Sequence, residues 1–237
     1  MSRADSPPRE TAAGRTGPSS RPRRLSRAQR HQQIRDTAAS QALRGGLQQL
    51  THRGIASALG VTHALVAHYE PDMEALRAHV CGALLQEEFE YLQQHLEAVS
   101  DPVEGARTLI RLMSSPERSA HAAVWLDGWS LGRRHADMAT VMRAMMQSWQ
   151  ELVSGLVSRG VASGAFANVD ARACAWEAIA LLDGLNAHML VGYGRRGEYT
   201  ERIAVPWEAR LGLAPGTLSA PSHTSAHHDQ QGDRRRP

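Results

Sequence analysis

The residues best suited to chemistry in this chain lie in a short window, residues 47–69, which reads LQQLTHRGIASALGVTHALVAHY. Apolar side chains recur there at helical spacing on both sides of Gly60, and glycine takes the positive φ that ends a helix at little cost. Thr62 follows, and its hydroxyl can accept hydrogen bonds from the free amides of a new first turn. The window therefore predicts two short helices joined by a tight turn, a common device for reading DNA.

Side chains at the start of the second helix would reach base edges in the major groove. His63 can donate to guanine or to phosphate, and Leu65 can contact a thymine methyl, whereas Val66 is expected to point inward. The alternative role of His68 is that of a hydrogen-bonded structural histidine. The predicted base-facing residues are Thr62, His63, Ala64, Leu65 and His68.

A second group of residues is aromatic and apolar. Trp125 and Trp129 are four residues apart, so they project from one helix face, and His121 shares that face. Such a group suits an amphipathic or aromatic ligand, with tryptophan faces for a cation and methionines that adapt to shape. The alternative is that the tryptophans pack the core, and that the polar residues of the group line a subunit interface. The candidate ligand-binding residues are His121, Trp125, Trp129, Met145, Trp149, Asp183 and His188.

Signals of enzymatic chemistry are weak. The sequence has no glycine-rich phosphate loop after a strand, no H-E-x-x-H and no G-x-S-x-G. Cys81 and Cys174 stand far apart in apolar surroundings, which indicates buried thiols rather than a disulfide or a metal clip. We therefore expect no catalytic residues, no cofactor and no metal site. The remaining metal alternative is a histidine group near the C-terminus, made of His223, His227 and His228.

The positive charge is concentrated at the N-terminus. Residues 1–30 carry eight arginines and two acids, whereas residues 31–210 carry sixteen arginines and twenty acids. Beside a DNA-reading motif, such an arm is expected to neutralise phosphates or enter the minor groove, although many arginine-rich termini are only solubilising tails. Within the motif, Arg53 is the only cation between Arg44 and Arg77, so it is expected to contact DNA.

Composition sets the class of protein. At 237 residues and 42% hydrophobic content, the chain can bury a full core in one or two domains. No apolar run is long enough for a membrane span, and the N-terminus lacks the apolar stretch of a secretory signal, so we expect a cytoplasmic protein.

Helical periodicity and capping residues predict an all-α fold without strand-like alternation. Pro206 lacks an amide donor, so the last helix is expected to kink there. The predicted helices, beyond the pair in residues 47–69, span residues 27–44, 72–97, 102–113, 115–132, 137–163, 170–191 and 200–211. The predicted domains are a disordered basic arm (1–26), a three-helix DNA-binding domain (27–86), a helical ligand-binding and dimerisation domain (87–212) and a disordered tail (213–237).

The N-terminal third resembles the TetR family of transcriptional regulators. IASALGVT is similar to the family pattern I-A-x-x-x-G-V-S/T, and HYEPDMEAL is similar to H-Y-F-P-S-K-x-x-L. Three residues depart from the pattern: Ala67 replaces a common tyrosine, Glu70 a phenylalanine and Met73 a phosphate-contacting lysine. Further on, W-L-D-G-W and L-L-D-G-L-N-A-H resemble the effector domains of betaine-type members. The residues that agree in the N-terminal third are Ile34, Ala38, Ala39, Gly46, Leu47, Thr51, His68, Tyr69, Pro71 and Leu76.

The resemblance implies a function. Thr51 and Tyr69 match family positions that donate hydrogen bonds to phosphate. The expected protein is a homodimer that binds a pseudo-palindromic double-stranded operator and is released by a small-molecule effector, with the dimer contact on residues 170–191 and 200–211. The alternative, motivated by Met73 and the acidic body, is a helical small-molecule-binding protein or enzyme with a vestigial DNA-binding motif.

Overall fold

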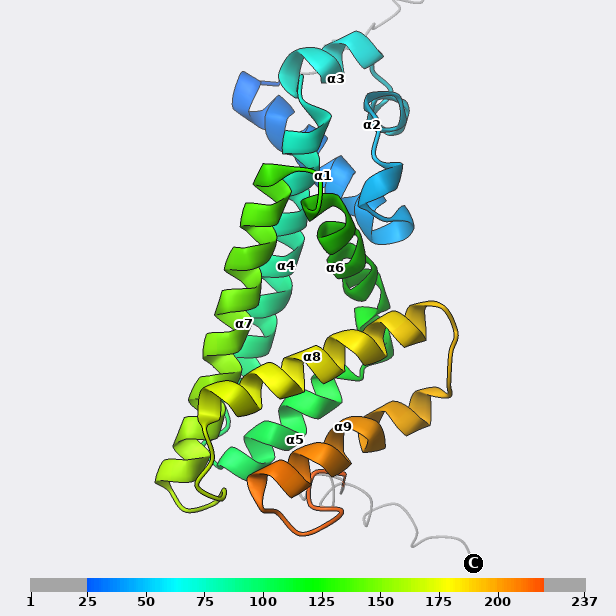
Figure 1. Ribbon diagram of the computed structural model, residues 1–237. Helices are drawn as coiled ribbons and strands as arrows, with labels where there is room; N and C mark the ends of the chain where they lie inside the picture. Colours follow the sequence, from blue (N-terminus) through cyan, green and yellow to red (C-terminus); the bar gives the residue numbers. More distant parts are fainter. Residues whose placement is uncertain (1–24, 220–237) are drawn as a thin grey trace, which may run out of the picture.

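The computed structural model describes residues 25–219, and of residues 196 and 197 it describes the backbone only. Within that range the chain folds into nine α-helices and two short 3₁₀ helices, with no β-strand (Figure 1). The prediction of an all-α fold is confirmed. The helices are α1 (Arg27–Gly45), η1 (Leu47–Gln49), α2 (His52–Leu59), α3 (His63–Tyr69), α4 (Met73–Glu97), α5 (Pro102–Met113), η2 (Pro116–Arg118), α6 (Ser119–Gly132), α7 (Ala136–Ala162), α8 (Ala171–Leu190) and α9 (Arg196–Leu211).

Polar caps set most of these helix ends. Ser26 forms a reciprocal capping box with Gln29 at the start of α1. Asp72, Asp101 and Asp170 accept backbone amide hydrogen bonds at the starts of α4, α5 and α8. Because such caps are local, the predicted boundaries agree with the structure to within a few residues. Two starts shift by four residues: α6 begins at Ser119 after η2 rather than at residue 115, and α9 begins before the predicted residue 200.

Helices α1 to α3 form a small N-terminal domain at one end of the molecule, and α4 leads from it into the larger helical body (Figure 1). The α4 and α7 helices run side by side, with α6 packed against both, while α8 and α9 lie together at the opposite end. Cys81 and Cys174 are buried free thiols, as predicted. Burial raises the pKa of the Cys81 thiol to about 12, so this sulfur is an inert packing group.

The C-terminal segment differs from its prediction. Residues 213–219 form turns packed against α9 rather than a disordered tail, because the buried carboxylate of Glu208 accepts hydrogen bonds from the amides of Gly216 and Leu218. Pro206 lies inside α9 on an exposed part of the helix, where water can solvate the carbonyl left without a donor. The basic arm up to residue 24 and the histidines near the C-terminus lie outside the described residues. Among the described helices, none is long and apolar enough to cross a membrane.

Candidate DNA-binding surface and effector cavity

The α2 and α3 helices form the predicted helix-turn-helix. Gly60 ends α2 with a left-handed φ of 64°, and the Thr62 hydroxyl caps α3 by accepting from the Leu65 amide at 3.3 Å. Val66 is fully buried, as predicted, and packs the helix onto the domain core. The predicted base-facing residues are exposed except Leu65, which is half-buried: Thr62, His63, Ala64 and His68. This arrangement leaves the start of α3 free to enter a major groove.

Glu70 fastens the end of α3 to the two helices beside it. Its carboxylate is almost completely buried and accepts from Arg35 Nε at 2.8 Å, with His31 Nδ1 at 3.1 Å. Its backbone carbonyl accepts from His52 Nε2 at 2.7 Å. The sequence marked Glu70 only as a departure from the resembled pattern. The structure shows that an ion-pair cluster takes the place that the pattern gives to an apolar side chain.

The cations of this domain fall into two groups. Arg35 and Arg77 are engaged in ion pairs, with Glu70 and Glu74 respectively. Arg44 and Arg53 are exposed, and so is Thr51, whose oxygen accepts from the Gly54 amide at 3.0 Å while its own hydroxyl proton is left to donate. Exposed guanidinium and hydroxyl groups such as these suit phosphate contacts.

A hydrogen-bonded junction joins the DNA-binding domain to α6. Asp127 on α6 accepts from the backbone amide of Leu47 at 2.7 Å and from Gln48 Nε2 at 3.1 Å. Gly46 precedes this contact with a φ of 85°, and a Cβ there would lie 2.5 Å from Asp127 Oδ2. Only glycine therefore permits both the backbone conformation and the close approach. Arg77 on α4 donates to the carbonyls of Leu47 and Leu50, which fixes η1 from its other side.

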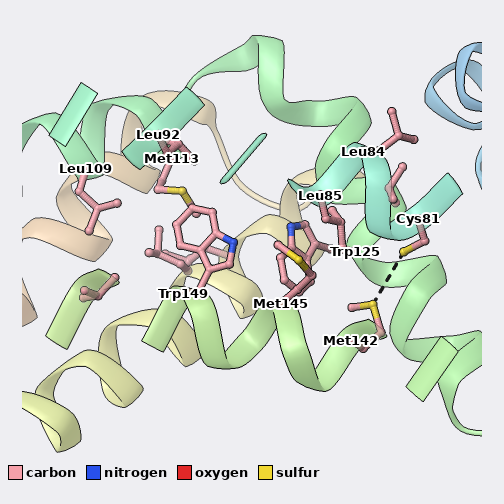
Figure 2. Packing of buried hydrophobic residues seen from close by; sticks show 14 of the residues in the cluster. Cys81, Leu84, Leu85, Leu92, Leu109, Met113, Trp125, Met142, Met145 and Trp149 are labelled. Atoms are coloured by element: carbon pink, nitrogen blue, oxygen red, sulfur yellow. Dashed lines mark hydrogen bonds between the residues drawn. The ribbon is translucent and has the colours of Figure 1, made fainter. Parts of the chain in front are cut away.

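A small cavity lies in the core of the C-terminal body, close to the packed side chains of Figure 2. Its free volume is about 20 Å³, enough for about one water molecule. The rings of Trp125 and Trp129 lie 5.5 Å apart, and the Trp149 ring is packed edge-on against Phe89. The cavity is lined by Met113, Arg118, Trp125, Met146, Trp149, Ile179, Leu182, Asp183 and Asn186.

Two polar groups of this cavity point to a ligand. Trp149 is 4% exposed, and its Nε1 donor has no hydrogen-bond partner. Burial raises the pKa of the Asp183 carboxyl to about 6, with the nearby charge of Arg118 opposing the shift. An unpaired buried donor is costly unless something binds to it. A carboxylate, an indole donor and aromatic faces together suit a small organic cation that also carries a hydrogen-bond acceptor.

Comparison with known proteins gives one match to a protein-family model. Residues 102–203 match the family model of the TetR C-terminal domain described as that of BetI-type transcriptional repressors. No curated protein matches the sequence.

Solved structures extend the similarity of fold to most of the chain. A transcriptional regulator from Saccharomonospora viridis in complex with choline is 21% identical, covers 78% of this chain and 98% of its own, and has a TM-score of 0.71. A TetR-family regulator from Agrobacterium tumefaciens is 20% identical, covers 78% and 100% of the two chains, and has a TM-score of 0.66. A regulator from Pseudomonas aeruginosa PAO1 is 20% identical over 83% and 96%, with a TM-score of 0.65.

The predicted ligand residues of the C-terminal body are not all brought together. Trp125, Trp149 and Asp183 line the cavity, but Met145 is turned into the core and its neighbour Met146 lines the cavity instead (Figure 2). His188 is exposed and packs edge-on against Tyr193. Met145 and His188 therefore lie outside the lining of this cavity. For Met145 the reason is that consecutive helix positions point about 100° apart.

The other aromatic-face residues lie beside the cavity rather than in it. Trp129 is half-buried against Trp125. His121 lines a second hollow of about 360 Å³ that opens between α4 and α6. Sequence reasoning missed Arg118, which lines both the hollow and the cavity. In the described part of the chain, no cluster of side chains is arranged to hold a metal ion.

Proposed function

We propose that this protein is a DNA-binding transcriptional regulator that acts in the cytoplasm as a homodimer and represses transcription until a small organic cation releases it. The observation that carries this proposal is the covalent union of an exposed recognition helix with a BetI-type C-terminal domain. The exposed side chains of His63 and His68 would read bases, while Arg53, Thr51 and Tyr69 would contact phosphates.

The surface of α8 and α9 supports the dimer. A single recognition helix buries too little surface for tight binding, so two copies are needed about one DNA turn apart. Among the described residues, most exposed large apolar side chains lie on α8, α9 or the loop between them. Exposed apolar side chains of this size are expected to be covered by a second copy. These side chains are Trp176, Leu190, Val191, Tyr193 and Val205.

The cavity supports a cationic effector. Tryptophan faces attract organic cations, and the Asp183 carboxylate adds a charge partner. The similar regulator from Saccharomonospora viridis binds choline, which combines a quaternary ammonium with a hydroxyl oxygen. The hydroxyl would accept from the unpaired Nε1 of Trp149. Choline is therefore the first compound to test.

A DNA selection experiment tests the proposal. Full-length protein is incubated with a random-sequence duplex library, and bound DNA is sequenced and verified by gel shift at fixed salt. We expect a pseudo-palindromic site whose complex dissociates when choline is added. His63→Ala should weaken binding and relax base preference, whereas Tyr69→Phe should weaken all sequences about equally.

The control is Arg143→Ala, which removes an exposed cation on α7, outside the helix-turn-helix, and should leave DNA binding unchanged. Recovery of no enriched sequence, together with choline binding, would favour the alternative of a small-molecule-binding helical protein with a vestigial DNA-binding motif.

A further inference from the structure

The guanidinium of Arg118 is enclosed by groups that would suit a free cation. Its Nε and Nη2 atoms donate to Glu88 Oε1 at 2.8 and 2.7 Å. Its Cζ lies 5.9 Å from the centre of the Trp149 ring, and Nη1 lies 3.0 Å from the sulfur of Met113. A buried carboxylate, an aromatic face and a thioether around one positive charge form a cation-binding site.

The carboxylate of this site is held in place independently of Arg118. Glu88 is 6% exposed, and its second oxygen, Oε2, accepts from Trp125 Nε1 at 3.0 Å. His121 Nδ1 lies 4.0 Å from Oε1. The glutamate would therefore stay oriented toward the cavity if Arg118 withdrew, leaving one oxygen available for another cation.

Arg118 also separates two spaces. It lines the small cavity beside Trp149 and the open hollow of about 360 Å³ between α4 and α6. It ends the short 3₁₀ helix η2, directly before α6, and rotation of its side chain leaves the backbone hydrogen bonds of both helices intact. Withdrawal of this one side chain would join the hollow to the cavity, which at about 20 Å³ is too small for an organic cation.

We propose that the guanidinium of Arg118 occupies the site for the effector's cation, which Glu88, Trp149 and Met113 form. An organic ammonium ion enters this site from the hollow by displacing the Arg118 side chain. This inference rests on the proposed function, whose effector cavity it completes. The exchange keeps the balance of charge, because one cation replaces another beside Glu88 and Asp183. Displacement of Arg118 is then the first step by which the ligand rearranges the segment that connects α5 to α6.

Removal of the Arg118 guanidinium tests this proposal. Tetramethylammonium and choline are titrated by calorimetry into the full-length wild-type protein and Arg118→Gln, with Trp125 and Trp149 fluorescence as a second readout. We expect the variant to bind tetramethylammonium at least tenfold more tightly than the wild type, because the ion no longer competes with the guanidinium. Glu88→Gln in the same variant should abolish the gain. Methylguanidinium should compete with tetramethylammonium in the variant.

The matched control is Arg107→Gln, which removes a similarly enclosed guanidinium that pairs with Glu104 and donates to the Thr217 carbonyl, outside the cavity and the hollow. Its affinity for tetramethylammonium should equal that of the wild type. If Arg118→Gln fails to fold, Arg118→Lys keeps a charge with poorer geometry and should bind the ion with an intermediate gain.

Two results would overturn the proposal: an Arg118 variant that folds but gains no affinity for tetramethylammonium, or one in which acetate binds instead. In the first case Arg118 is a plain structural ion pair, and in the second it anchors an anionic effector. The gel shift with choline on the wild-type protein tests the proposed function separately from the role of Arg118. A gain in ion affinity without any DNA binding would support the cation site and contradict the proposed role as a regulator.

Discussion

Replacement of Asp183 by asparagine should make the protein more stable at neutral pH but not at acid pH. Burial raises the pKa of this carboxyl from 3.8 to about 6, so the folded protein holds the proton more tightly than the unfolded chain does. The stability that comes from the protonated form is complete below pH 3.8 and is lost as the pH rises through 6. The ionised carboxylate therefore opposes folding above pH 6.

The magnitude follows from the shift. A difference of about two pKa units corresponds to about 3 kcal/mol at pH values above both pKa values, of which about 2 kcal/mol develops between pH 4.5 and 7.5. Asparagine has nearly the same shape and no titration. The stability of Asp183→Asn relative to the wild type should therefore rise by about 2 kcal/mol across that interval.

Urea unfolding of both proteins at pH 4.5, 5.5, 6.5 and 7.5, at one protomer concentration, measures this difference. Glu151→Gln, a change of an exposed carboxyl in the middle of α7, serves as the control for the loss of one carboxyl from the surface. Parallel stability curves for Asp183→Asn and the wild type would refute the reasoning, since they would mean that water reaches the carboxylate in the folded protein.

Three other changes test the contact of Asp127 with η1, the packing of Gly160 against Phe166 and the role of the basic arm. Asp127→Ala removes two hydrogen bonds to η1, each worth about 1.5–3 kcal/mol, and should reduce the effect of choline on operator affinity about tenfold. A full response to choline in gel shifts would show that the signal takes another route. Gly160→Ala places a Cβ 2.0 Å from the Phe166 ring and should cost at least about 2 kcal/mol in urea unfolding, whereas Gly155→Ala, with its nearest contact at 3.8 Å, should cost nothing; equal stabilities would contradict the close packing. Deletion of residues 1–26 should flatten the slope of log affinity against log salt by roughly five units while operator preference survives, and an unchanged slope would mean that the arm does not touch DNA.

The helical framework was predictable because its signals are local. Thr62, Asp101 and Asp170 each cap the helix that follows them, and each cap is visible within a few residues of sequence. The inward direction of Val66 and the burial of Cys81 followed in the same way from periodicity and apolar neighbours. The exposure of most residues of the candidate DNA-binding surface was therefore predictable, and their contacts with DNA stay predictions.

Only part of the candidate effector site could be predicted from the sequence. Trp125, Trp149 and Asp183 were named and line one cavity, but the phase of α7 could not be fixed closely enough to choose Met146 over Met145. Consecutive residues differ by about 100° around a helix, so an uncertainty of one position moves a side chain from the cavity to the core.

Contacts between distant segments were decided by the tertiary structure alone. Sequence determined which segments of this protein are helical, where they begin and end, and which faces are apolar, because these depend on neighbours in the chain. It did not determine that Glu70 would meet Arg35, that Asp127 would hold the Leu47 amide or that Arg118 would fill the space beside Glu88 and Trp149. Each of these charges finds its partner at least thirty residues away, and only the packing of whole helices brings such groups within hydrogen-bonding distance.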